Sequence, residues 1–214
     1  MRFKTVVWDF NGTLLDDTGI SMDAMNTVLA KRGLKLIPSL REFRQVFGFP
    51  VKDYYERIGL DFSKEPYEIP ADEWVALYSQ KMFTAPLMNE ARETLELFRA
   101  AGIKQIILSA SETKRLRKHL EILGIDEYFS EINGADDVYA KGKEDRARLL
   151  SKRDDLFPAA LIGDTDHDFE SARLSGCTPY LFSGGFMSRE RLEPLGAPVS
   201  SSLLEIAKYI VKDF

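Results

Sequence analysis

The residues with the clearest potential for chemistry follow a short apolar run near the start of the chain. Residues 6–8 (VVW) are bulky and β-prone, which predicts a buried strand, and Asp9 comes directly after it. Asn11 and Gly12 then form a strong turn signal. Gly12 lets the backbone approach a ligand closely, and Thr13 offers a hydroxyl beside it. A carboxylate at this place is either an ordinary turn residue or part of a ligand site in the crevice of an open α/β sheet.

Polar residues follow two further apolar runs in the same way. Residues 103–108 predict a buried strand that is followed by Ser109, and residues 159–162 predict another that ends shortly before Asp164. Because the carboxyl ends of parallel strands face one crevice, we expect these residues to meet Asp9 there. Each of them alone is also a common type of helix N-cap. Together they predict a site, because two carboxylates suit a hard cation such as Mg²⁺ and Ser109 at a helix N-terminus suits a phosphate.

The order of the apolar runs predicts the fold that positions these residues. From residue 89 onwards helices alternate with strands, which is typical of a doubly wound parallel sheet in an α/β fold. The strands are expected at residues 6–8, 103–108, 128–132, 159–162 and 179–182. Between residues 17 and 88 the apolar spacing is helical and indicates no strand, which predicts a small helical bundle inserted into the α/β domain. In the basic helix that follows Ser109, we expect His119 at the surface.

The composition narrows the class of protein. The chain has 214 residues, enough to bury a substantial core, with 44% hydrophobic and 29% charged residues. Its formal net charge of −5 argues against a nucleic-acid-binding protein, although local cations can still hold an anionic substrate. Cys177 is the one cysteine, which excludes an intrachain disulfide and a cysteine-based metal site. The first apolar run is too short for a signal peptide or a membrane span, so we expect a cytoplasmic protein with no membrane partner.

Four segments of the chain resemble the motifs of the haloacid dehalogenase superfamily of phosphohydrolases, in the branch that has a helical cap. The sequence DFNGTL at residues 9–14 matches the first motif, Asp-x-Asp-Gly-Thr, except at its third position. Ser109 closes a strand as in the second motif, and GDTDHD at residues 163–168 matches the fourth motif, Gly-Asp-x-x-x-Asp. Lys141 or Lys143 is the lysine of the third motif, and we favour Lys143 because it adjoins a predicted helix. The resemblance implies a Rossmann-like core with an inserted α-helical cap.

The resemblance also implies a magnesium-dependent phosphatase that forms an aspartyl-phosphate. Asp9 would attack the phosphorus, which divides one difficult step into two. Mg²⁺ would be held by Asp9, the backbone carbonyl of Asn11 and Asp164, with direct or water-mediated support from Asp168. The phosphate oxygens would bind to Ser109, Lys143 and the amides of Gly12 and Ala110, with the Thr13 hydroxyl beside them. The cation is needed because a carboxylate does not readily approach a phosphate dianion unless charge is neutralised.

Position 11 departs from the family pattern in a way that affects the chemistry. Phosphatases of this family usually have an aspartic acid there, which protonates the leaving group and then activates water, whereas Asn11 cannot transfer a proton. Such acid–base help is worth about 10²–10⁴-fold in rate. The chain is therefore a slow phosphatase for good leaving groups, an enzyme whose cap supplies the proton relay, or a protein that binds phosphorylated ligands with little turnover. A dehalogenase is disfavoured because Asp164 and Asp168 preserve a metal site, and a phosphomutase because it needs the missing acid.

The predicted cap covers residues 17–87, and residues 1–16 and 88–214 form the predicted α/β core. In capped members the insert closes over the site and its loops select the leaving group. Arg44 and Lys52 flank a Gly-Phe-Pro turn and are candidates for binding an anionic group of the substrate; the alternative is a plain helix connection with solvated cations. Related capped members include phosphoglycolate phosphatases, so the expected partner is a small phosphorylated metabolite with a carboxylate. We expect a monomer or a homodimer.

Overall fold

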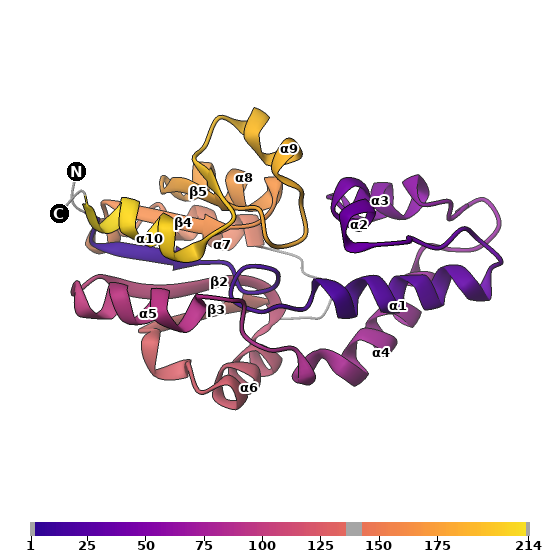
Figure 1. Ribbon diagram of the computed structural model, residues 1–214, viewed down its shortest axis with the longest axis horizontal. Coiled ribbons are helices and arrows are strands. Elements are labelled where there is room, and N and C mark those ends of the chain that lie inside the picture. Colours follow the sequence, from indigo (N-terminus) through magenta and orange to yellow (C-terminus); the bar gives the residue numbers. More distant parts are fainter. Residues whose placement is uncertain (1–2, 136–142, 213–214) are drawn as a thin grey trace.

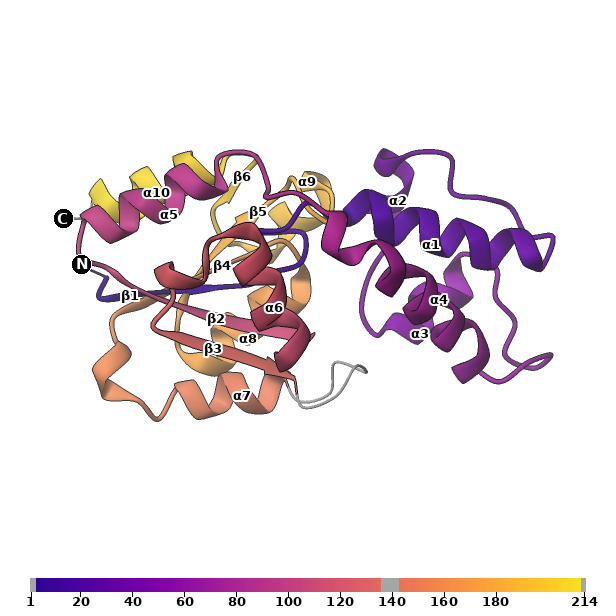
Figure 2. The same ribbon diagram turned by 90° about the horizontal axis from the view of Figure 1, so that it is seen from below.

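The computed structural model describes residues 3–135 and 143–212. Within them, six parallel strands form a sheet in the order β3-β2-β1-β4-β5-β6 (Figures 1 and 2). The strands are β1 (Thr5–Trp8), β2 (Lys104–Glu112), β3 (Glu131–Ala135), β4 (Ala159–Gly163), β5 (Thr178–Phe182) and β6 (Val199–Ser200). The chain adds β2 and β3 on one side of β1 and the later strands on the other, which creates a crevice at the carboxyl ends of the central strands. The predicted doubly wound parallel sheet is confirmed.

A group of helices between β1 and β2 lies beside the sheet rather than on its faces (Figure 1). These elements are α1 (Thr18–Lys31), α2 (Leu40–Val46), α3 (Val51–Arg57), α4 (Glu68–Lys81) and a 3₁₀ turn at Met82–Thr84. Their apolar side chains, among them Met25, Leu29, Phe43 and Tyr54, form a hydrophobic cluster that also takes in Phe186 from the loop after β5. The described residues of this insert contribute no strand to the sheet, as the sequence predicts.

The remaining helices cover the two faces of the sheet. α5 (Ala91–Ala100), α6 (Thr113–Leu123) and α10 (Leu203–Lys212) pack on the face that carries Val6 and Trp8, whereas α7 (Lys143–Leu150) and α8 (Asp166–Ser175) pack on the face that carries Val7. The short α9 (Arg189–Leu192) precedes β6. Successive side chains of a strand point to opposite faces, so a central strand that is covered on both sides is apolar at every position. Among the described residues, no helix has the length and apolar character needed to cross a membrane.

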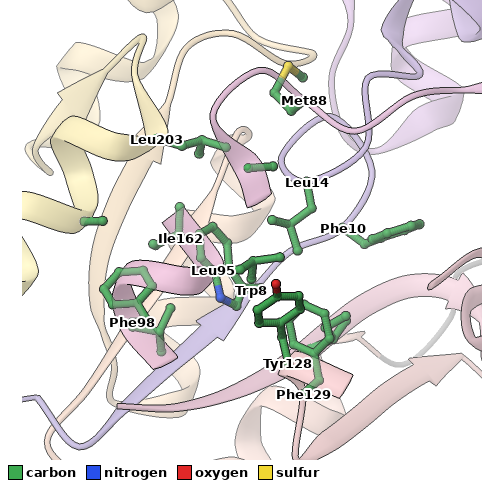
Figure 3. Close-up of a cluster of buried hydrophobic side chains, with 14 of the residues drawn as sticks. Trp8, Phe10, Leu14, Met88, Leu95, Phe98, Tyr128, Phe129, Ile162 and Leu203 are labelled. Atoms are coloured by element: carbon green, nitrogen blue, oxygen red, sulfur yellow. The ribbon is translucent and has the colours of Figure 1, made fainter. Parts of the chain in front are cut away.

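The larger hydrophobic core lies under α5, α6 and α10 and is centred on Trp8 (Figure 3). The Trp8 ring contacts Phe98 edge to face, with 5.8 Å between the ring centroids. Its indole N–H donates a hydrogen bond of 3.0 Å to the side chain of Gln105, whose amide donates to the carbonyl of Leu95. The polar atom of this large side chain is therefore satisfied inside the core. The packing holds β1 rigidly at the middle of the sheet, directly before Asp9.

Two connecting segments join the helical unit to the sheet, and they are hydrogen-bonded to each other. The Asp16 amide donates to the carbonyl of Pro86 at 2.9 Å, and the Met88 amide donates to the carbonyl of Leu14 at 2.8 Å. These bonds lie at the predicted boundaries of the cap, after residue 16 and before residue 88. The assignment of cap and core as separate domains stays a prediction.

Three strands differ from the sequence-based expectation. β2 continues to Glu112, so Ser109 lies inside this strand and not at the N-terminus of the following helix, which begins at Thr113. The strand expected at residues 128–132 begins only at Glu131, because Asp126–Tyr128 form a 3₁₀ turn. β6 was not expected, and its two residues are too few for a periodic pattern to reveal it. The differences at β3 and β6 lie on the two edges of the sheet, away from the central strands that carry the candidate residues.

His119 is buried, so the predicted surface position is wrong. Only 1% of the residue is exposed, and its ring lies against Phe10 and Phe83 with centroid separations of 5.4 and 5.1 Å. Leu116 and Leu120 are buried on the same side of α6, so helical spacing places His119 on the apolar face of this basic helix. Burial lowers the pKa of His119 to about 4.

We expect His119→Leu to make the fold less sensitive to acid. As the pH falls below 6.5, His119 becomes protonated in the unfolded chain, whereas in the folded protein it is protonated only near pH 4. The free energy of unfolding therefore falls over this pH window. Between about pH 7 and pH 5 the parent should lose about 2 kcal/mol in free energy of unfolding by this proton uptake. The leucine variant has no histidine to protonate and should not show this loss. Urea unfolding followed by circular dichroism at the two pH values measures it. Equal losses in both proteins would contradict the assignment.

Candidate active site

The register of the sheet brings the predicted strand ends to one level. Trp8 of β1 pairs with Ile107 of β2 on one side and with Ile162 of β4 on the other. Asp9 and Asp164 therefore follow neighbouring strands in close register, and the Asp9 amide donates to the carbonyl of Ile162 at 2.9 Å. The crevice that the sequence predicts at these strand ends is thus formed by β1, β2 and β4.

A buried cluster of three carboxylates and one lysine lies in this crevice. One oxygen each of Asp9, Asp164 and Asp168 lie within 4.8 Å of one another. The Lys143 ammonium, at the start of α7, donates to Asp9 Oδ1 at 2.5 Å and to Asp168 Oδ1 at 2.6 Å. Lys143 is 4% exposed. Lys143 therefore occupies the position that the sequence favours for the motif lysine, and Lys141 lies outside the described residues.

Asp168 is held so that it orients its neighbours. Its Oδ2 accepts hydrogen bonds from the amides of Asp164 and Thr165 and from the Thr165 hydroxyl, while its Oδ1 accepts from Lys143. Thr165 in turn caps α8 through the Asp168 amide, which completes a capping box at the helix N-terminus. Both oxygens of Asp168 are already engaged. These contacts position Lys143 and the loop of Asp164, and the role of Asp168 as a metal ligand stays a prediction.

Asp164 is oriented from two sides by segments that close around it. The Thr13 hydroxyl donates to its Oδ1 at 2.9 Å, and the Phe186 amide donates to its Oδ2 at 2.6 Å. This approach needs two glycines, because a Cβ on Gly12 or Gly185 would lie 2.4 or 2.1 Å from Asp164 Oδ2. Gly12 also has a φ of +75°, which favours glycine. Position 12 therefore requires glycine, because the backbone packs closely against the Asp164 carboxylate there.

The electrostatics of the cluster are those of an excess of buried negative charge. Burial, together with the charge of Asp168, raises the pKa of Asp9 to about 7, although Lys143 opposes the shift. Burial and the two neighbouring carboxylates also raise the pKa of Asp164 well above its usual range. Burial acts against the charge on Lys143, but Asp168 and Asp9 outweigh it and raise the Lys143 pKa. A divalent cation held by oxygen ligands fits this cluster, because one lysine does not balance three buried carboxylates.

The side chain of Asn11 is held by three partners that do not leave it free to rotate. Its Nδ2 donates to Asp17 Oδ2 at 2.8 Å and to the Tyr78 hydroxyl at 2.9 Å, and its Oδ1 accepts from the Ser111 hydroxyl at 2.6 Å. The Tyr78 hydroxyl, from α4 of the insert, also donates to Asp17 at 2.5 Å. Burial raises the pKa of Asp17 to about 6. A titratable group from the edge of the insert thus lies next to the asparagine.

The predicted phosphate-binding residues take different places. Ser109 and Ala110 lie at the end of the crevice and line the cavity described below. The Gly12 amide donates to Asp17 Oδ1 and to the carbonyl of Leu15. Thr13 is fully buried and its hydroxyl is committed to Asp164, as described above. The phosphate-binding roles of Ser109, Ala110, Gly12 and Thr13 stay predictions.

Arg44 and Lys52 do not line the cavity that extends from the carboxylate cluster. The Arg44 guanidinium donates to the carbonyls of Gly184 and Gly185, at 2.6 and 2.7 Å, and so ties the insert to the loop after β5. The Lys52 ammonium lies over the ring of Phe62, 5.5 Å from its centroid. The structure therefore does not bring these two cations to the carboxylate cluster. Their role in substrate binding stays a prediction, and a structural role for Arg44 is visible.

A single cavity of about 570 Å³ connects the carboxylate cluster with the insert. Its inner end is lined by Asp9, Asp164 and Lys143, and its outer part by aromatic side chains of α3, α4 and the loop before α3. His167, at the start of α8, also lines the cavity, and its ring lies 4.7 Å from that of Phe49. The cavity is therefore formed jointly by the core and the insert.

Sequence reasoning missed three contributors to this site: Asp17, Tyr78 and the loop at Gly185 and Phe186. Asp17 was visible as the second acid of an Asp-Asp pair close to the first motif, and the glycine pair after the last predicted strand marked the loop. Tyr78 carried no signal, because nothing in a helical pattern tells which aromatic side chain reaches the core.

A family model described as haloacid dehalogenase-like hydrolase matches residues 6–181 of the chain. The chain belongs to this family of haloacid dehalogenase-like hydrolases. The match spans both the insert and all strands up to β5, so the resemblance inferred from the motifs is confirmed. The described part of the core contains the acidic cluster that the family's usual divalent metal would require.

Relatives and solved structures agree with this family. The chain is 26% identical over 216 aligned positions to phosphoglycolate phosphatase of Caulobacter vibrioides, covering 95% of this chain and 89% of the relative. A phosphoglycolate phosphatase of Aquifex aeolicus is also 26% identical, with 86% of each chain covered. Among solved structures, a haloacid dehalogenase-like family protein from Streptococcus pneumoniae has a TM-score of 0.79 at 22% identity, with 97% of this chain and 98% of that chain covered. That likeness concerns the fold.

Proposed function

We propose that the protein is a magnesium-dependent phosphohydrolase that acts on a small organic phosphate monoester through an aspartyl-phosphate on Asp9. The observation that carries this proposal is the arrangement of Asp9 and Asp164 at the ends of adjacent strands with Lys143 at the start of α7, all buried at the bottom of a cavity that opens toward the insert. The names of the relatives support phosphate ester hydrolysis, and the family supports a divalent metal.

In this proposal each residue of the site has a separate chemical role. An oxygen of Asp9 forms a bond to phosphorus while the bond to the ester oxygen breaks, and the leaving group departs with the electron pair. Water then attacks phosphorus, which releases inorganic phosphate and restores the carboxylate. Lys143 and Ser109 bind the phosphoryl oxygens during both steps. A bound Mg²⁺, held by Asp9, Asp164 and the Asn11 carbonyl, would neutralise part of the phosphate charge.

A second candidate is a protein that binds phosphorylated ligands with little turnover. Asn11 favours it, because the side chain at this position has no transferable proton and is held in place by Asp17, Tyr78 and Ser111. Substrates with good leaving groups distinguish the two candidates, since their hydrolysis depends least on a proton donor.

The proposed compartment is the cytoplasm, on the basis of the single cysteine, and the proposed partner is a small phosphorylated metabolite.

Phosphate release from p-nitrophenyl phosphate and acetyl phosphate tests the proposal directly. The purified protein should release phosphate from at least one of them when Mg²⁺ is present, and EDTA should stop the release. The physical reason is that the leaving group of both compounds, one an aryl ester and the other an acyl phosphate, departs without prior protonation. If neither compound is hydrolysed at any Mg²⁺ concentration, the enzyme proposal fails and the binding candidate takes its place.

We expect Asn11→Asp to raise turnover of alkyl phosphates about tenfold to a hundredfold, which is part of the gain typical of acid–base catalysis. The new carboxyl group would lie beside Asp17, whose oxygen is 2.8 Å from the present amide nitrogen. Two carboxyl groups at that distance do not both ionise near neutral pH, so one keeps a proton for the leaving group.

Steady-state kcat on an alkyl phosphate and on p-nitrophenyl phosphate measures this effect. The aryl ester should respond much less, because its leaving group needs little protonation. Asn11→Ser serves as the matched control, since serine also alters the contacts of position 11 but supplies no acid. Unchanged alkyl phosphate rates in Asn11→Asp would place the proton relay elsewhere in the site.

A further inference from the structure

The cavity above Asp9 is too large for a two-carbon phosphate ester and has an aromatic outer wall. Its volume of about 570 Å³ falls in the range of pockets that enclose ligands with ring systems. The wall facing the carboxylate cluster is formed by aromatic side chains of the insert: Phe47, Phe49, Tyr54, Tyr55, Tyr67 and Trp74. A ligand whose phosphate reaches Asp9 must place the rest of its atoms against this wall.

The charges around the cavity do not favour a substrate carboxylate. Among the described residues that line it, the cationic side chains are Lys143 and Arg115. Lys143 is bonded to Asp9 and Asp168, as described above. The Arg115 guanidinium donates to the Ser79 hydroxyl at 3.0 Å and lies 3.9 Å from a carboxylate oxygen of Glu112. A second anionic group on the ligand would therefore have to compete with partners that these cations already have.

Two ring contacts give the wall a defined geometry. Phe49 lies against His167 of α8, with a centroid separation of 4.7 Å, so this contact spans the insert and the core. Trp74 and Tyr78 are stacked, with centroids 4.9 Å apart and an angle of 11° between their planes.

We propose that the substrate is a phosphate monoester of a ring-bearing alcohol or phenol, with the ring packed against the aromatic wall of the insert that includes Phe49 and Trp74. This proposal rests on the proposed phosphohydrolase function and specifies its leaving group. Aromatic rings pack favourably against one another in offset or edge-to-face arrangements, which a flat ring can reach in this cavity. The site chemistry agrees with the shape of the cavity, because a phenolic leaving group depends little on the acid that Asn11 lacks.

Phosphonates that cannot be hydrolysed test recognition separately from turnover. Binding of benzylphosphonate, methylphosphonate and phosphonoacetate is measured by calorimetry in saturating Mg²⁺. We expect benzylphosphonate to bind at least about tenfold more tightly than either of the other two, because only it carries a ring. Phosphonoacetate that binds as tightly as benzylphosphonate, or more tightly, would overturn the proposal in favour of a carboxylate substrate.

Variants of the aromatic wall locate the ring. Phe49→Leu and Trp74→Leu should each weaken benzylphosphonate about threefold to tenfold and leave methylphosphonate unchanged, since each removes one ring contact. Phe83→Leu is the matched control, because Phe83 is an aromatic residue of the insert that does not line the cavity and whose ring contacts His119. Benzylphosphonate binding that is equal in the parent and both wall variants would overturn the proposal.

The two proposals fail in different ways. Selective benzylphosphonate binding without phosphate release from any ester would remove the enzyme proposal and retain the ligand class. Phosphate release together with no preference for a ring would retain the enzyme and remove the ligand class. If no phosphonate binds even weakly, both proposals fail, because the phosphate end of the site is common to them.

Discussion

Asp9→Asn should reduce magnesium-dependent phosphate release by at least about a thousandfold, as expected when the nucleophile of a covalent mechanism is removed. Asparagine has nearly the same shape but does not form the acyl phosphate. The fold should survive, because Lys143 keeps its hydrogen bond to Asp168 when Asp9 is replaced. Since the pKa of Asp9 is raised to about 7, its charge destabilises the metal-free fold above that pH, and the variant should be at least as stable there.

Three measurements check this expectation. Phosphate release with p-nitrophenyl phosphate measures the loss of activity, thermal unfolding without metal at pH above 7 measures stability, and the rise in Tm on adding Mg²⁺ measures metal binding. The Mg²⁺ effect on Tm should be smaller in Asp9→Asn than in the parent. Asp23→Asn is the matched control, because Asp23 is exposed on α1. Activity of Asp9→Asn within tenfold of the parent would exclude Asp9 as the nucleophile.

Lys143→Met should be the most destabilising single change at the site. Removing one partner of a buried ion pair leaves uncompensated charge and typically costs about 3–5 kcal/mol. Lys143 is 4% exposed and its ammonium is the cation bonded to both Asp9 and Asp168. Phosphate release should also be lost, because the lysine no longer neutralises the carboxylates or the phosphoryl oxygens.

The pH dependence of that loss has a definite sign. Without the lysine, the pKa of Asp9 in the folded state rises further above its unfolded value, and the pKa of Asp168, which Lys143 holds low in the parent, rises as well. The penalty is therefore largest at high pH, where both are ionised, and shrinks as the pH falls and the folded state takes up protons. Chemical denaturation across a pH series measures this penalty. Lys114→Met is the control, because Lys114 is an exposed residue of α6. A penalty that grows toward acid pH would contradict the ion-pair assignment.

The central strands and the candidate nucleophile were predictable from the sequence because their signals are local. The apolar run before Asp9 and the run before Asp164 mark buried strands without any knowledge of the rest of the chain. Parallel strands share one direction, so the carboxyl ends of both runs meet in one crevice. The choice of Lys143 over Lys141 rested on its place at a helix start, and the structure brings Lys143 to Asp9.

Other parts of the site depend on contacts that no local pattern encodes. Asn11 meets Tyr78, 67 residues later, and Arg44 meets Gly185, 141 residues later. In sequence Arg44 was a candidate for binding substrate, but the packing of α2 on the loop after β5 uses its guanidinium to join insert and core. His119 shows the same limit, because a charged helix still has one buried face.

The sequence by itself determined the doubly wound sheet, the helical insert, the family and the acids at the strand ends, because each is written in residue type and spacing within one segment. Only the tertiary structure decided how the insert meets the core. That packing sets the partners of Asn11, engages Arg44 with the loop after β5 and encloses the cavity between the aromatic wall and the carboxylates. The physical reason is that side chains on separate helices acquire a common function only when long-range packing places them around the same space.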